Sequence, residues 1–100
     1  MRKIALLCSS GLSTSMLVKK MREAAEKDGY EIEIGAYAIG QAETTCVGAD
    51  VILIAPQAAW KKDSVKKLFP DCPQEVIEMQ TYGMVDGAKV IKRVKELLGD

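Results

Sequence analysis

The sequence contains no histidine, and this absence excludes several kinds of catalytic site. A Ser-His-Asp triad and a Cys-His dyad both depend on an imidazole as the general base. The lack of histidine also argues against a zinc centre, because histidine is one of the main zinc ligands. A nucleophile in this chain must therefore be activated by other means.

Net charge and long apolar runs are missing as well. Lys+Arg and Asp+Glu both number 14, so the overall charge directs the chain neither to nucleic acid nor to an anionic membrane. No apolar stretch approaches the roughly 20 residues that span a bilayer. The run that follows Met1-Arg2-Lys3 is too short for the apolar part of a signal peptide.

Cysteine is scarce. The three cysteines, Cys8, Cys46 and Cys72, are odd in number and show no C-x-x-C spacing. This pattern argues against a disulfide framework and favours a reducing, cytoplasmic environment. Only Cys8 lies in a distinctive setting, so Cys46 and Cys72 are interpreted as structural.

What the sequence does contain is an alternation of strand and helix patterns over 100 residues, a length that predicts one domain, 1–100. Apolar runs at 4–7 and 51–55 predict buried strands, and 31–37 and 76–79 predict edge strands. Periodicity predicts a helix from about Met16 to just before Gly29, a second one up to Phe69, and a third after a cap at Asp86. The stretch 39–48 has only a weak helical pattern.

This order of elements predicts an α/β fold, a four-stranded parallel sheet with helices on both faces. Two buried strands flanked by two edge strands suggest the strand order 2-1-3-4. Ligands bind such sheets where the winding direction reverses, outside the carboxyl ends of the strands. Three segments are expected to meet there: the loop after Cys8, the Pro56-Gln57 turn, and the loop 80–83 with Tyr82 and Gly83.

Cys8 stands at the end of the first predicted strand, and a loop of small residues follows it. That loop consists of Ser9, Ser10, Gly11, Leu12, Ser13, Thr14 and Ser15. Free backbone N–H groups and the positive end of the next helix favour a thiolate and a bound phosphate at such a position. Cys8 is therefore predicted to be a nucleophile that carries a phosphoryl group. The plainer alternative is a buried cysteine followed by serines that form a turn and a cap, with Ser13 as the cap.

Two features next to the third predicted strand are less informative. Lys61, Lys62, Lys66 and Lys67 lie on one predicted helix, and we interpret them as a solvated face, with a docking surface for an acidic partner as the alternative. Trp60, which precedes them, is interpreted as packed, with a functional role as the alternative because it is close to the Gln57 turn.

The chain resembles the IIB components of the sugar phosphotransferase system, and most closely the lactose/cellobiose (chitobiose) branch. The loop 8–15 is similar to the phosphocysteine loop of that family. The resemblance continues through Ala49-Asp50, Pro56-Gln57, Pro70 and the segment 82–87. These motifs occur in the same order across the whole chain, which makes the resemblance specific.

The resemblance implies a flavodoxin-like fold, similar in arrangement to the low-molecular-weight tyrosine phosphatases, and a cytoplasmic phosphotransferase subunit without a cofactor or a metal. A IIA protein would donate a phosphoryl group from a phosphohistidine to Cys8. Cys8 would pass it to a sugar, expected to be a β-linked disaccharide, that is held by the membrane permease IIC. The chain would meet the membrane only through IIC and would bind no nucleic acid.

Two other classes of protein stay open at this point. Low-molecular-weight tyrosine phosphatases have the loop pattern C-x5-R, whereas Thr14 occupies the arginine position here. The guanidinium that clamps a phosphate through two hydrogen bonds is therefore missing. In a non-enzymatic anion-binding module, Cys8 would be idle. Transfer of labelled phosphate to Cys8 distinguishes the three possibilities.

Overall fold

Four parallel strands form one sheet in the order β2-β1-β3-β4, as the sequence predicts. The coordinates are a computed structural model, and they describe residues 1–9 and 15–100. The strands are β1 (Arg2–Cys8), β2 (Ile32–Ala38), β3 (Val51–Ile54) and β4 (Gln74–Val76). The α-helices are α1 (Ser15–Lys27), α2 (Ala42–Thr45), α3 (Lys62–Leu68), α4 (Met79–Gly83) and α5 (Gly87–Leu98). Two 3₁₀ helices, η1 (Ile39–Gln41) and η2 (Pro56–Lys61), follow β2 and β3.

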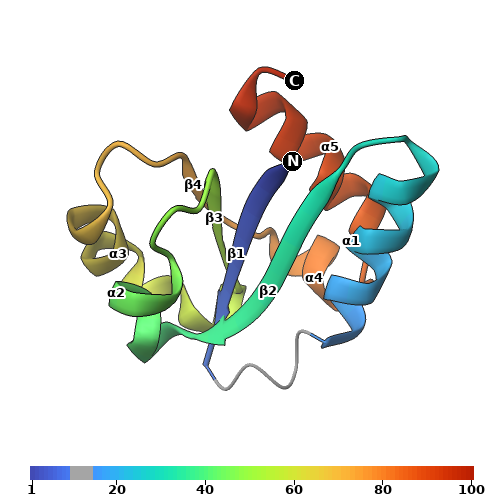
Figure 1. Cartoon of the computed structure of the whole chain (residues 1–100). Coiled ribbons are helices and arrows are strands. Elements are labelled where there is room, and N and C mark those ends of the chain that lie inside the picture. The colour runs from blue at the N-terminus through green and yellow to red at the C-terminus, as the bar shows by residue number, and fades with distance from the viewer. Residues whose placement is uncertain (10–14) are drawn as a thin grey trace.

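Helices cover both faces of the sheet, so the molecule has three layers. In Figure 1, α1, α4 and α5 lie on one side of the strands, and α2 and α3 lie on the other. The alternation of side chains along β1 separates the two cores: Ile4 and Leu6 face the α1 side, whereas Ala5 and Leu7 face the α3 side. The central strands are buried on both faces, which explains why their sequences contain unbroken apolar runs.

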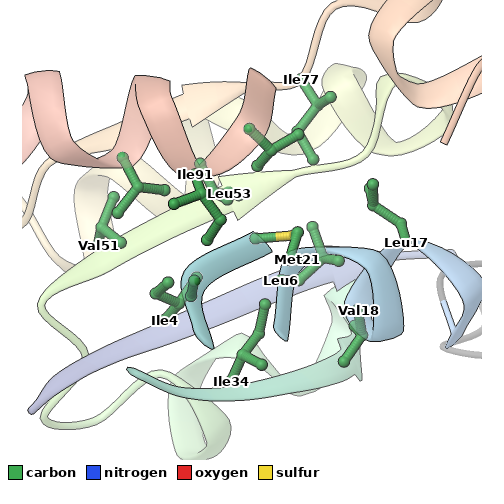
Figure 2. Packing of buried hydrophobic residues seen from close by; sticks show 13 residues of the cluster. Ile4, Leu6, Leu17, Val18, Met21, Ile34, Val51, Leu53, Ile77 and Ile91 are labelled. Atoms are coloured by element: carbon green, nitrogen blue, oxygen red, sulfur yellow. The ribbon is translucent and has the colours of Figure 1, made fainter. Parts of the chain in front are cut away.

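The larger core lies between the sheet, α1 and α5. Figure 2 shows Met21 of α1 beside Leu6 of β1, and Ile91 of α5 beside Leu53 of β3; Leu17 and Val18 of α1 belong to the same cluster. Met21 and Leu6 are fully buried. Because the buried side chains of α1 recur at helical spacing, the helix presents one apolar face to the core, where it packs against β2 and α5. The packing of the core therefore fixes how α1 lies against the sheet.

The end of α1 and the start of α5 have the capping residues that the sequence predicts. After α1, Gly29 has a φ of +67°, the Tyr30 N–H donates to the Ala25 carbonyl at 2.8 Å, and the Gly29 N–H donates to the Glu26 carbonyl at 3.1 Å. These two hydrogen bonds form a Schellman motif, which satisfies carbonyls that the helix end would leave unpaired. At the start of α5, the Asp86 carboxylate accepts a hydrogen bond from the Lys89 N–H at 3.1 Å.

The edge strands differ from the prediction in one case. The strand predicted at 76–79 is formed by Gln74–Val76 instead, although the Ile77 N–H still donates to the Ile54 carbonyl at 2.8 Å. The polar residues fit this edge because Glu75 pairs with Arg93 and the Gln74 amide donates to the Phe69 carbonyl at 2.8 Å. The apolar pair at 76–77 therefore marks the end of the strand and not its beginning.

Two further expectations are refined. The helix predicted up to Phe69 consists of η2 followed by α3, because Pro56 begins a tighter turn in which the Ala58 N–H donates to the Ala55 carbonyl at 2.9 Å. The weak helical pattern in 39–48 corresponds to the short helices η1 and α2.

Candidate functional site

Cys8 is the last residue of β1, at the carboxyl edge of the sheet. It pairs with Ala38 of β2. Its side chain alternates with Leu7 and so lies on the same face as Leu6, the face that α1 covers. Cys8 is only 1% exposed, whereas Ser9, the next residue, is exposed. The thiol thus lies just beneath the surface, on the side of the sheet where the first turn of α1 begins.

The segment that follows β3 lies beside Cys8, as predicted. The Ala55 N–H donates to the Leu7 carbonyl at 2.7 Å, which extends the pairing of β1 and β3 to their carboxyl ends. Pro56 follows immediately, and η2 contacts β1. Gln57 is exposed at the start of η2. Pro56 and Gln57 therefore lie at the edge of the sheet on which Cys8 ends.

The segment that follows β4 differs from the prediction of a loop at 80–83. These residues belong to the helix α4, in which the Tyr82 N–H donates to the Glu78 carbonyl at 2.9 Å. Buried Thr81 attaches this helix to the core, and Tyr82 packs against the cluster between the sheet and α1. Tyr82 and Gly83 therefore belong to a helix on the α1 side of the sheet.

The remaining predicted loop residues lie outside the described part of the chain. These are Ser10, Gly11, Leu12, Ser13 and Thr14. The cap predicted at Ser13 is among them. Ser15 is the first residue of α1 and is exposed.

The sequence analysis missed the segment after β2. Cys8 and Ala38 are paired directly, and η1 begins at Ile39. The exposed residues Gly40 and Gln41 thus leave the sheet one strand away from the thiol. The parallel order could have revealed this, because β2 is the immediate neighbour of β1 and all carboxyl ends meet at one edge.

The other two thiols lie on the opposite face of the sheet, in the core that α2 and α3 cover. Burial raises the pKa of Cys46 and of Cys72 above the ordinary thiol value. The Cys72 sulfur also contacts the Ala49 carbonyl oxygen at 3.4 Å. All three cysteines are free of disulfide bonds. Protonated, enclosed thiols fit the structural role that the sequence suggests for Cys46 and Cys72.

The lysines of η2 and α3 are engaged to different degrees. The Lys66 ammonium donates to the Pro70 carbonyl at 3.1 Å and so closes the end of α3. Lys61 lies over the Trp60 ring, 5.2 Å from its centroid. Trp60 itself is 75% exposed, so the expectation that it is packed is wrong.

A hollow of about 430 Å³ opens between β4 and α5, with an apolar floor that includes Leu53, Ile77 and Val90. Cys8 is not among the residues that line it. Within residues 1–9 and 15–100, no three side chains of the metal-binding types come together, and no helix there has the length and apolarity needed to cross a membrane.

A cysteine at the carboxyl end of a central parallel strand, followed by a helix, is placed as in the anion-binding sites of α/β proteins. Comparison with known proteins identifies the group more closely. Residues 3–93 match the family described as PTS system, lactose/cellobiose-specific IIB subunit. The chain therefore belongs to this family of phosphotransferase subunits, whose role is that of a phosphoryl carrier.

Individual relatives agree with this assignment. The oligo-beta-mannoside-specific EIIB component of Bacillus subtilis is 42% identical over 100 residues, with 98% of this chain and 97% of the relative covered. The cellobiose-specific EIIB component of Lactococcus lactis is 39% identical over 102 residues, with 95% and 94% covered. The solution structure of a cellobiose-specific IIB component from Borrelia burgdorferi superimposes with a TM-score of 0.81 at 30% identity, with 98% of this chain and 92% of that chain covered.

Proposed function

We propose that Cys8 is the residue that carries the phosphoryl group. The observation that supports this most is its place at the carboxyl end of the central strand β1, on the face covered by α1. Backbone N–H groups at a helix start attract a phosphoryl group and stabilise a thiolate. Cys46 and Cys72 are unsuited to this role, because burial on the other face raises their pKa and keeps them protonated.

The donor in this proposal is a IIA protein with a phosphohistidine. The Cys8 thiolate attacks phosphorus in line, so that the S–P bond forms as the N–P bond breaks and its electron pair returns to the imidazole nitrogen. In the second step a sugar hydroxyl held by the permease IIC attacks phosphorus. The O–P bond forms, the thiolate leaves with the S–P electron pair, and the hydroxyl proton passes to a base on the acceptor side. The chain acts in the cytoplasm, between the two partners.

The residues of this chain contribute position and electrostatics in both steps. Met21 and Leu17 pack in one cluster with Leu6 of β1 and hold α1 against the sheet, and this packing is proposed to keep the helix start near the sulfur. The loop 9–15 is proposed to hold the phosphoryl oxygens, with Pro56, Gln57, Tyr82 and Gly83 as candidate lining residues. The printed names of the relatives include cellobiose and an oligo-beta-mannoside, which supports a β-linked sugar as the final acceptor.

Site-directed variants test this role. A phosphorylated IIA protein of the lactose/cellobiose family should label the wild-type chain, Cys46→Ser and Cys72→Ser equally, and should not label Cys8→Ser. Label that persists in Cys8→Ser would refute the assignment. Para-nitrophenyl phosphate serves as the control for the competing phosphatase function: multiple turnovers that disappear in Cys8→Ser would make the chain a hydrolase.

A further inference from the structure

Trp60, the only tryptophan of the chain, is on the surface. It lies at the end of η2 and is 75% exposed. Tryptophan carries a large apolar area and is the residue type most enriched among the energetic centres of protein interfaces. Trp60 is therefore a candidate contact residue for another molecule.

A cluster of positive charge surrounds this side chain. Four lysines follow Trp60 within seven residues, and Asp63 is the only acid among them, so the segment carries a net charge of +3 on a chain whose total is zero. Three of the four lysines are exposed, and the fourth, Lys61, lies against the Trp60 ring. This basic surface consists of Trp60, Lys61, Lys62, Lys66 and Lys67.

The basic surface starts close to the candidate site. Ala55 is hydrogen-bonded to Leu7, the residue before Cys8, and Trp60 follows five residues later along a 3₁₀ helix. A rise of about 2 Å per residue places Trp60 roughly 10 Å from Ala55. A protein interface of ordinary size covers about 800 Å² on each partner, a patch with a radius of about 16 Å. A partner that reaches Cys8 is thus large enough to cover Trp60 as well.

We propose that the basic surface docks the phosphorylated IIA donor; this rests on the function proposed above for Cys8. Charge distinguishes the donor from the acceptor. The donor arrives with a phosphoryl group that carries a charge of about −1.5 to −2, whereas the acceptor offers a neutral sugar hydroxyl. A positive surface attracts the phosphoryl group of the donor and has no comparable attraction for a neutral sugar hydroxyl. Once the phosphoryl group is on Cys8, its negative charge offsets the lysines and favours release of the donor.

The test is the rate of phosphoryl transfer from a phosphorylated lactose/cellobiose-family IIA protein. The double variant Lys61→Gln/Lys62→Gln should raise the KM for this donor by about tenfold, leave kcat unchanged, and reduce the salt dependence of kcat/KM. The matched control, Lys27→Gln/Lys92→Gln, removes the same charge from α1 and α5 and should leave KM unchanged. An equal KM in the two double variants would overturn the proposal.

Trp60 provides a direct readout of docking. With a tryptophan-free donor, its fluorescence should move to shorter wavelength when the donor is added, and Trp60→Ala should raise KM without changing kcat. Unchanged fluorescence emission would contradict the proposal. A variant that loses only the transfer of the phosphoryl group to permease membranes would also contradict it, because the basic surface would then dock the acceptor. If the wild-type chain accepts no phosphoryl group at all, the function proposed for Cys8 is wrong. If the wild-type chain is labelled and the lysine and Trp60 variants have the same KM as the wild type, only the proposal of a docking surface is wrong.

Discussion

Gly87, the first residue of α5, lies close to the backbone of α1 at Lys20 and Met21. A methyl carbon added at this position would lie 2.5 Å from the Met21 nitrogen, 2.6 Å from the Lys20 carbonyl oxygen, and closer still to the Lys20 carbonyl carbon. Normal contacts between such atoms are about 3.5 to 4.0 Å. Gly87→Ala therefore forces the two helices apart by on the order of 1 Å.

The loss of stability is considerable because the opposing atoms belong to the backbone of a packed helix, which cannot move aside as a flexible side chain can. Overpacking of this kind typically costs about 1–3 kcal/mol, and the better helix propensity of alanine returns at most about 1 kcal/mol. We expect a net loss of about 1–2 kcal/mol in the free energy of unfolding. At about 4–8 °C for each kcal/mol in a domain of this size, the midpoint of thermal unfolding should fall by about 4–16 °C.

Urea unfolding followed by circular dichroism measures this loss. Gly83→Ala is the matched control, because nothing lies within 4 Å of a methyl group at that position, and its stability should stay within about 0.5 kcal/mol of the wild type. If Gly87→Ala is as stable as Gly83→Ala, the close packing of α1 and α5 is wrong.

Two other predictions concern titratable groups. Side-chain hydrogen bonds from Arg2 and then Tyr30 lower the pKa of Asp100 to about 2. A carboxylate whose pKa is lower in the folded state stabilises the protein at a pH above its unfolded pKa of about 3.9. That stabilisation is lost as the pH falls towards 2. Urea unfolding from pH 6 to pH 2 should therefore show that Asp100→Asn is less stable than the wild type above about pH 4. The difference in the free energy of unfolding should become smaller below that pH, and a difference that does not depend on pH would contradict this account. Because burial raises the pKa of Cys46 and Cys72, both thiols in Cys8→Ser should react with iodoacetamide at pH 7.5 more slowly than free cysteine does. Peptide mass spectrometry measures the two rates, and a rate equal to that of free cysteine would show that neither thiol is enclosed.

The sheet could be predicted because its signals are local and strong. The apolar runs of β1 and β3, the glycine after α1 and the cap at Asp86 each depend on a few neighbouring residues. The order of the strands followed from the contrast between doubly buried and half-buried strands. The position of Cys8 at the carboxyl edge was a direct consequence.

The wrong predictions concern residues whose surroundings are formed by elements distant in the sequence. β4 contains polar residues because Arg93 and the carbonyl of Phe69 lie beside it, and both partners come from other elements. Trp60 is exposed, contrary to the prediction, and nothing in the local sequence places it outside the core. The position of η1 beside the end of β1 depends on which strand pairs with β1, and not on a motif.

The central claim is that this chain carries a phosphoryl group on Cys8 from a donor to an acceptor. The most direct measurement is a chase of the isolated, phosphorylated protein with membranes that contain the IIC permease and its sugar. The account predicts that the phosphoryl group stays on Cys8 until the membranes and the sugar are both present, and that one sugar phosphate then forms for each group lost. Release as inorganic phosphate, at the same rate with and without the permease, would contradict it.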